Sequence, residues 1–448
     1  MSMRRHAPQL VLLITLLFSA VGEPALAQQD PVAGDRQDEI EARFAEAYAA
    51  LNAERLYTAR KLLAELVTDY PTLLRARLEL ARAEYLARDL DAAEAQVLRV
   101  LDDPEVPASV RTTLLAFLAQ IRDDQQTLAD RHSWSGQIYG GLLYDSNVNF
   151  GVSRDVIDLG GARLNLAPEL SDGAGVIDAG LGHTYNPNKT FRSGERTGFF
   201  LWQSQLNGYY RGYFGNDEFT LPVPPATTIS TEDFDLGVAT FRTGPSWVVP
   251  GAWRFGIGLQ ADQLWLGGSK LAFIGSVNPN GTWQLNPLTA VSAGLTWSRR
   301  NFQQFSPDGR DGDLWRADAS ISRLVLERKV NLEAGIGYGV LDADDERFSF
   351  GSADAFVGAT WQAWTRGQLY TRLGYRKFNY DGAELPPFSA ARNEDEWRYT
   401  LGFRHQFART FLEGWVLRGE WIYTNNSSNI PVFEFDRNLL SIGLEKSF

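Results

Sequence analysis

Apolar and polar residues alternate with a period of two in many segments between Ser133 and Phe448. The alternation is clearest over residues 253–262, 330–340, 397–404 and 415–424. Because successive side chains of a β-strand point to opposite faces of the sheet, each segment is predicted to form a strand with one apolar face. The two-residue period therefore predicts an all-β region from residue 133 to the end of the chain.

The preceding region, from about Asp35 to Asp130, follows a helical period instead. It is rich in Ala, Leu, Arg and Glu and has no glycine after Gly34. These residue types favour helices. The change of period and composition near residue 132 predicts a domain boundary there.

The helical region contains a 34-residue repeat. The matched pairs are Ala47/Ala81, Leu56/Leu90, Ala59/Ala93, Leu63/Val97, Leu66/Val100, Val67/Leu101 and Asp69/Asp103. The repeat length, the small residues and Pro71 at the end of the first unit resemble tetratricopeptide (TPR) repeats. A third helical stretch, 108–121, is expected to cap the array. Two interpretations remain open: a groove that binds a peptide or protein, or a helical spacer.

The first 27 residues have the features of a secretory signal peptide. Arg4 and Arg5 precede an apolar stretch over 10–20, and Ala25-Leu26-Ala27 forms a cleavage pattern. We therefore expect a signal peptide at 1–27, a helical domain at 28–132 and a β domain at 133–448. No later stretch approaches the 18 or so apolar residues of a transmembrane helix, which leaves a transmembrane β-barrel open.

Three features favour a membrane barrel over a soluble sandwich, which shows the same alternation. The polar faces carry large charges beside many glycines, as in a wet lumen. Trp and Tyr gather near segment ends, and the last segment ends in the aromatic Phe448. The predicted fold class is thus α+β multidomain: N-terminal α-helical TPR-like repeats followed by a C-terminal 14-stranded antiparallel transmembrane β-barrel.

The fourteen predicted strands define the connections and the orientation. Pro279 and Gly281 in the sixth strand predict a bulge or bend. Connections alternate between long and short, and long loops are usual on the outer side of the outer membrane. The helical domain is therefore expected in the periplasm. The predicted spans are 135–145, 175–185, 197–210, 232–242, 252–266, 270–285, 289–300, 313–326, 330–341, 352–363, 367–379, 395–406, 413–424 and 436–448.

Composition and chemistry point away from catalysis. The chain has no cysteine and a net charge of −12, which excludes thiolate chemistry and disfavours nucleic-acid binding. His132, His183 and His405 lack a nucleophile motif, so no catalytic residue and no enzyme activity is predicted. The acidic stretches 308–313 and 342–346 are interpreted as solvated turns rather than metal sites, since the first does not match an EF-hand loop. No cofactor-binding or metal site is predicted.

The charged residues of the alternating strands are the candidate functional residues. If the apolar positions face lipid, these charges line the lumen. They either pair with one another and rigidify the wall or form a path for a translocating chain. Neutralising Arg398, Arg404 and Arg418 together is expected to weaken transport without preventing assembly. The predicted lumen residues are Arg254, Asp262, Arg316, Asp318, Glu333, Arg372, Arg376, Arg398, Arg404, Arg418 and Glu420.

Two segments at opposite ends of the β region carry a family resemblance. The first predicted strand ends in residues 144–149 (YDSNVN), and the chain ends in residues 435–448 (FDRNLLSIGLEKSF). Together with helical repeats ahead of a 14-strand barrel, they resemble the surface lipoprotein assembly modifier (Slam) family. Residues 144–149 alone would also suit a polar turn.

The resemblance implies an outer-membrane translocation factor that delivers surface lipoproteins or related secreted proteins to the cell surface. The expected partners are that client, outer-membrane lipid, a periplasmic chaperone and the barrel assembly machinery, with no nucleic acid. An exopolysaccharide export porin, or a passive porin with a periplasmic accessory domain, are the alternatives.

Overall fold

The computed structural model describes residues 31–104, 106–152, 156–159, 162–165, 168–221, 227–304, 309–409 and 411–448. The chain divides into two compact units. The first contains the residues up to Arg131 together with Pro187–Phe199, and the second contains His132–Asn186 and Phe200–Phe448. The predicted signal peptide, 1–27, lies outside the described residues.

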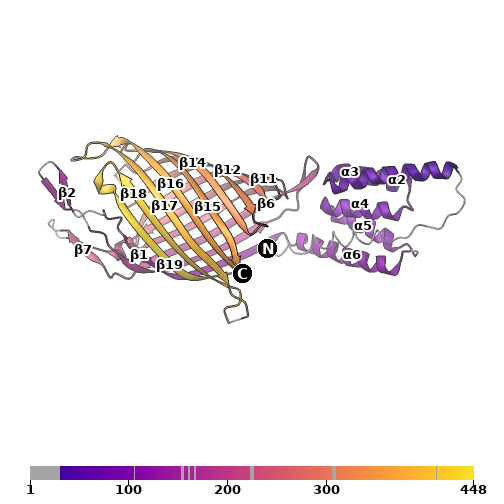
Figure 1. Cartoon of the computed structure of the whole chain (residues 1–448), viewed down its shortest axis with the longest axis horizontal. Coiled ribbons are helices and arrows are strands. Elements are labelled where there is room, and N and C mark those ends of the chain that lie inside the picture. The colour runs from indigo at the N-terminus through magenta and orange to yellow at the C-terminus, as the bar shows by residue number, and fades with distance from the viewer. Residues whose placement is uncertain are drawn as a thin grey trace. The chain divides into compact units, whose positions relative to one another are not determined.

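The described residues of the first unit form five helices: α2 (Pro31–Asn52), α3 (Leu56–Asp69), α4 (Leu74–Leu86), α5 (Leu90–Leu101) and α6 (Ala108–Ala129). The helices are labelled in Figure 1. The 34-residue repeat recurs in their packing. Ala47 on α2 and Ala81 on α4 are both fully buried, as are Ala59 on α3 and Ala93 on α5. Small residues at these positions let neighbouring helices approach closely. Helix pairs α2–α3 and α4–α5 therefore repeat one arrangement.

A hairpin from the β region belongs to this helical unit. It consists of β5 (Thr190–Ser193), a turn, and the first residues of β6 (Arg196–Tyr213). The Thr58 backbone N–H donates to Glu195 Oε2 at 2.9 Å, and the Leu56 N–H donates to the Glu195 carbonyl at 3.2 Å. Arg196 pairs with Glu54 at 2.7 Å. The sequence analysis had placed this hairpin in the β domain.

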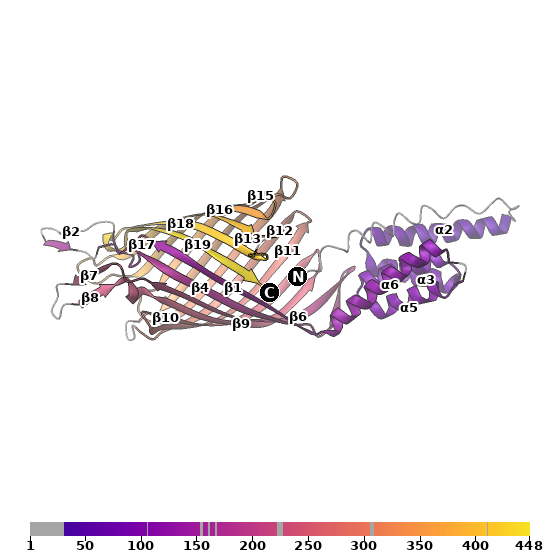
Figure 2. The same ribbon diagram turned by 90° about the horizontal axis from the view of Figure 1, so that it is seen from below.

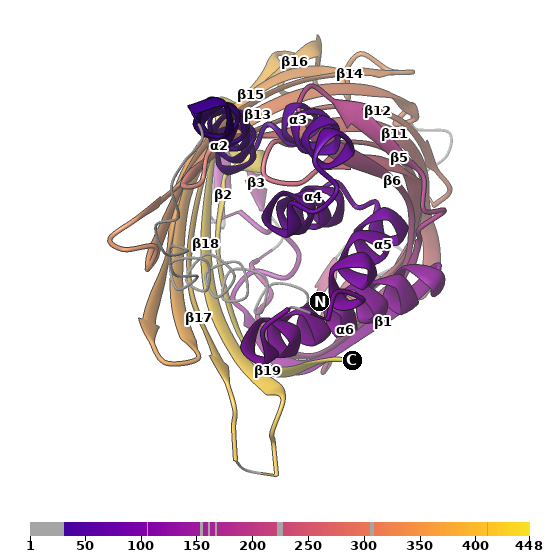
Figure 3. The same cartoon turned by 90° about the vertical axis from the view of Figure 1, so that its right-hand side faces the viewer.

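Fourteen long antiparallel strands form the second unit, which is a closed barrel. The strands run obliquely in Figure 1 and form a ring in the view of Figure 3. Each strand pairs with its neighbours along the chain, and β1 with β19 completes the ring. The strands are β1 (His132–Asp145), β4 (Asp172–Tyr185), β6, β9 (Leu236–Val249), β10 (Trp253–Leu266), β11 (Ser269–Asn286), β12 (Thr289–Phe302), β13 (Gly312–Val325), β14 (Val330–Ala343), β15 (Phe350–Trp364), β16 (Gly367–Ala383), β17 (Ala391–Gln406), β18 (Trp415–Ser428) and β19 (Phe435–Ser447).

The predicted fold class is confirmed, with two differences in detail. The fourth strand begins at Leu236 and ends at Val249, several residues beyond the predicted 232–242. Of the bulge or bend predicted at Pro279 and Gly281, a bulge is absent: the β10–β11 register runs unbroken through Pro279 and shifts only between Leu264 and Trp265. The β11–β12 pairing is interrupted at residues 278 and 279 but keeps its register across them. Pro279 fits because its φ is compatible with a strand and only its N–H is missing. Short strands also occur in the connections: β2 (Val156–Leu159), β3 (Ala162–Asn165), β7 (Glu218–Leu221) and β8 (Thr227–Ser230).

The first and last strands close the ring side by side (Figure 2). Their antiparallel register joins Gln137 to Ser447 at one end and Asp145 to Leu439 at the other. Beyond this ladder, the backbone N–H of Phe448 donates to the Gly136 carbonyl at 2.9 Å, and the Gly136 N–H donates back at 2.7 Å. The C-terminal residue is thus hydrogen-bonded into the seam.

The two faces of the barrel differ as the alternation predicted. Large apolar side chains on one face are exposed, including Ile336 at 65%, Tyr338 at 58% and Leu440 at 58%. Pairs of aromatic rings lie on neighbouring strands, such as Tyr375 and Trp397 with centroids 4.8 Å apart. An apolar outer face with aromatic residues suits contact with lipid in an outer-membrane barrel. Among the described helices, none is both long and apolar enough to cross a bilayer.

Candidate functional site

Long charged side chains on the other face reach across whole strands. Arg316 on β13 contacts Asp354 on β15 over Gly337 on the intervening β14, at 2.7 Å. Tyr370 on β16 donates to Glu420 on β18 at 2.8 Å over Gly402 of β17. Side chains two strands apart converge on the concave side of a closed sheet, and a glycine between them leaves room for the contact. We call this the inner face.

Most of the predicted lumen residues have polar partners on the inner face. Arg254 donates to Ser246 Oγ at 3.0 Å and to Gln203, and Asp262 accepts from Thr240 Oγ1 at 2.6 Å. Arg404 pairs with Glu445 at 2.7 Å. Arg418 pairs with Glu420 at 3.5 Å, and both belong to the predicted lumen residues. The other charged partners are not among the predicted lumen residues. The described contacts include no hydrogen bond or ion pair for four members: Asp318, Glu333, Arg372 and Arg398.

The structure separates the three arginines whose joint neutralisation was considered. Arg404 on β17 lies directly across from Arg418 on β18, and each has its own carboxylate. Arg398 lies across from Thr424, six residues along the same strand from Arg404. Six strand residues span about 20 Å. Arg398 therefore belongs to a different part of the wall.

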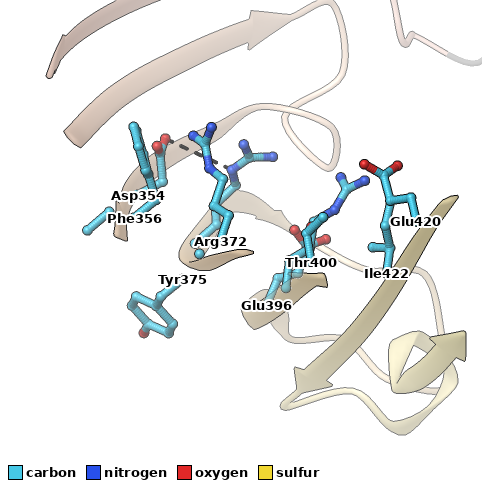
Figure 4. Close-up of a pocket in the computed structure, with 12 residues that line it drawn as sticks. Asp354, Phe356, Arg372, Tyr375, Glu396, Thr400, Glu420 and Ile422 are labelled. Carbon is cyan, nitrogen blue, oxygen red and sulfur yellow. Dashed lines mark ion pairs between the residues drawn. The ribbon is translucent and has the colours of Figure 1, made fainter. Parts of the chain in front are cut away.

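That part is a cavity of about 350 Å³ on the inner face of β15 to β18. Figure 4 shows its lining, with the Tyr375 ring turned away from the side chains of Arg372, Glu396, Thr400 and Glu420. It gathers four of the predicted lumen residues: Arg372, Arg376, Arg398 and Glu420.

The arginines of the cavity are held differently. The Arg372 guanidinium lies 3.5 Å from the centroid of the Phe356 ring, which fixes it by a cation–π contact. Arg376 Nε lies 4.0 Å from Asp354 Oδ1, and Figure 4 draws this ion pair. The same Nε atom is buried and has no hydrogen-bond partner among the described residues. The cavity can therefore offer guanidinium N–H groups to a ligand.

Sequence reasoning missed several inner-face residues that complete these contacts: Asp354, Phe356, Tyr370, Glu396 and Glu445. Each lies at an alternate position of a predicted strand, so the two-residue period could have found them. Their partners could not be found this way, because a pair two strands apart depends on register.

The two segments that carried the family resemblance form one buried network. Asp145, at 0% exposure, accepts from Arg437 Nε at 2.8 Å, from a second Arg437 nitrogen, and from Tyr213 OH at 2.6 Å. The Asn147 amide donates to the carbonyls of Asp436 and Gly151, at 3.0 and 2.8 Å. Residues 144–149 are therefore more than a polar turn: they join β1 to β19.

The remaining candidates from the sequence have local contacts. Arg347 pairs with Asp345 at 2.6 Å, and Asp311 accepts from the Phe302 backbone at 2.6 Å. A nitrogen of His132 lies 2.9 Å from one of His183, and the Trp364 indole donates to His405. Among the described residues, no group of three or more His, Asp or Glu side chains could hold a metal ion.

The chain is similar to known proteins at two levels. Residues 301–445 match a family described as protein of unknown function (DUF2860). A "Surface lipoprotein assembly modifier" of Pasteurella multocida (strain Pm70) is 23% identical over 443 residues, covering 95% of this chain and 79% of the relative.

Similar solved structures include an anion-selective porin and another outer membrane protein. An anion-selective porin from Comamonas acidovorans aligns at 11% identity and a TM-score of 0.39, covering 71% of this chain and 99% of the porin. OmpT of Vibrio cholerae, in a form lacking loop L8, aligns at 10% identity and a TM-score of 0.37, covering 71% and 100%. TM-scores this low establish neither a shared detailed geometry nor a shared function. The similarity to the Pasteurella protein, together with the closed 14-strand barrel, confirms the resemblance of this chain to the surface lipoprotein assembly modifier family.

Proposed function

We propose that this protein is an outer-membrane translocation factor that delivers surface lipoproteins, or related secreted proteins, to the cell surface. The observation that carries the proposal is the combination of a helical unit with a closed barrel whose inner face is charged. The name of the Pasteurella relative supports it. The barrel would be inserted by the barrel assembly machinery, and a periplasmic chaperone would escort the client.

The proposed orientation places the helical unit in the periplasm. The short connections β11–β12 (Pro287–Leu288), β13–β14 (Leu326–Lys329) and β15–β16 (Thr365–Arg366) lie at the barrel end where β1 begins. Short turns are usual on the periplasmic side. The TPR-like repeats would bind the client there. Because the periplasm has no nucleotide to drive transport, folding or capture of the client outside would supply direction.

Surface proteomics tests this function. Intact cells with and without the gene are treated with protease, and the released peptides are compared. We expect one or two proteins to disappear from the surface while their cellular pools persist, because synthesis continues without delivery. The outer-membrane protein profile serves as the control for general barrel assembly. An unchanged set of surface proteins would contradict the proposal.

An exopolysaccharide export porin is the second candidate. Aromatic side chains lie beside charges on the inner face, as Phe356 does beside Arg372. Such surfaces also suit sugars. Loss of surface glycan, with surface proteins intact, would favour this candidate. Free passage of small ions through the purified protein, with a dispensable helical unit, would favour a passive porin.

A further inference from the structure

The floor of the inner-face cavity is a glycine with open space above it. Gly374 on β16 lies across from Phe356 on β15 and from Arg398 on β17. A Cβ added to Gly374 would meet only the Arg398 carbonyl oxygen, at 3.9 Å. Arg372 and Arg376 lie two positions either side of Gly374 and therefore project from the same face. The three arginines surround one unfilled space, which we call the Gly374 cradle.

The acidic residues of the cavity neutralise these arginines only in part, because Asp354 is shared between Arg376, at 4.0 Å, and Arg316. Asp354 Oδ1 forms an ion pair with Arg316 Nη1 at 2.7 Å, and Arg316 Nη2 donates a hydrogen bond to Asp354 Oδ2 at 3.1 Å. Glu420 accepts from Tyr370 and pairs with Arg418. Arg316 and Arg418 do not line the cavity, and each thus forms an ion pair with one of these two carboxylates.

Glu396 is the remaining acidic group of the lining. It lies across from Arg376 in the register, yet no ion pair within 4.0 Å joins the two among the described contacts. With Arg316 and Arg418 included, five arginines therefore face three carboxylates, which leaves the cradle with two surplus positive charges. A guanidinium presents its N–H donors as a planar fork that matches the oxygens of an oxyanion.

We propose that the Gly374 cradle is a binding site for a phosphate-type oxyanion. A carboxylate has two oxygens and suits one arginine fork, whereas a tetrahedral dianion offers enough oxygens for three arginines and matches the surplus charge. Thr400 adds a hydroxyl donor at the rim. The phosphate belongs either to a free ion or to a lipid headgroup. This inference does not depend on the proposed export function.

Binding is measured with the full-length protein in detergent, titrated with inorganic phosphate by calorimetry in a buffer without other oxyanions. Two variants test the cradle. Gly374→Leu fills the space above the floor while keeping every charge, and its Cβ meets nothing closer than 3.9 Å. Arg398→Gln removes a guanidinium that has no hydrogen bond or ion pair among the described residues, so folding should be preserved. Arg404→Gln is the matched control, because Arg404 pairs with Glu445 outside the cavity.

We expect saturable binding to the wild type and to Arg404→Gln, and at least about tenfold weaker binding to both cradle variants. Heat-modified mobility in electrophoresis checks that each barrel is folded. Absence of saturable binding to the folded wild type would overturn the proposal, as would equal binding by folded Gly374→Leu and Arg398→Gln.

A second titration, with short-chain phosphatidic acid below its micelle concentration, identifies the source of the phosphate. Tighter binding than inorganic phosphate, lost in the same two variants, assigns a headgroup. Equal or weaker binding assigns the free ion. Either result supports the oxyanion site, and surface proteomics on the same variants reports separately on export.

Discussion

At the scale of single residues, the seam between the ends of the barrel depends on one buried charge pair. Asp145 and Arg437 are 292 residues apart, 0% and 8% exposed, and joined by two hydrogen bonds. The Arg437 guanidinium also lies 4.4 Å from the centroid of the Phe150 ring. Removing one partner of such a pair leaves an uncompensated buried charge, which costs far more than losing a surface pair.

Arg437→Gln is therefore expected to lower the free energy of unfolding by about 3–5 kcal/mol. The measurement is the midpoint of urea unfolding of the barrel in detergent. Arg404→Gln, which breaks a half-exposed pair, should cost about 0–1 kcal/mol. Asp145→Asn combined with Arg437→Gln should recover part of the loss, because no charge is then left unpaired. Equal stability of wild type and Arg437→Gln would show that the pair does not hold the seam.

At the scale of elements, helix α3 depends on a residue from the hairpin. Its own N-cap residue, Arg55, makes no side-chain capping bond. Glu195 instead accepts from the Thr58 backbone, and this bond is the main cause that lowers the pKa of the Glu195 carboxyl below its ordinary 4.5. A carboxylate is also favoured by the positive end of a helix dipole.

Glu195→Ala is expected to raise hydrogen exchange in the first turn of α3 about fivefold at neutral pH, a typical capping effect. Because the folded pKa is lowered, the protection is complete above pH 4.5 and is lost as the pH falls through the lowered value. Hydrogen-exchange mass spectrometry of residues 54–60, corrected for intrinsic exchange rates, measures both the effect of the variant and its pH dependence. Glu65→Ala, an exposed position on the same helix, is the control. Protection that is independent of Glu195 would refute the capping role.

At the scale of the whole molecule, the inner face combines local ion pairs with unpaired charge. Arg404 and Arg418 have carboxylate partners, which suits a wall stabilised by pairing. Arg398 has no such partner among the described contacts and is free to meet a passing ligand. The pairing interpretation therefore suits Arg404 and Arg418, and the path for a translocating chain stays a prediction.

Replacing Arg398, Arg404 and Arg418 with alanine is expected to weaken client delivery by about tenfold or more, because the path loses three cations, while the barrel still assembles. Surface proteomics measures delivery, and heat-modified mobility measures assembly. Lys377→Ala removes an exposed cation of β16 next to Arg376, on the opposite face of the strand, and is the control. Normal delivery by a folded triple variant would remove the charged path from the proposal.

The extent of sequence-based prediction differed between elements and sites. The alternation located the strands closely, from β1 to β19, because a half-buried strand needs a two-residue period. It failed for β9, whose apolar run extends to Val249. The lumen residues were chosen by face, and the role proposed for them stays a prediction. The Gly374 cradle was not foreseen, since it requires three strands in register.

The sequence by itself determined the local periods: a helical region with a 34-residue repeat, followed by strands with one apolar and one charged face. Those patterns are fixed by side-chain spacing within each element. Only the tertiary structure decided which distant residues meet, such as Asp145 with Arg437, Glu195 with Thr58, and Arg316 with Asp354. The physical reason is that closure and register are cooperative: a shift of one residue would turn each inner side chain outward.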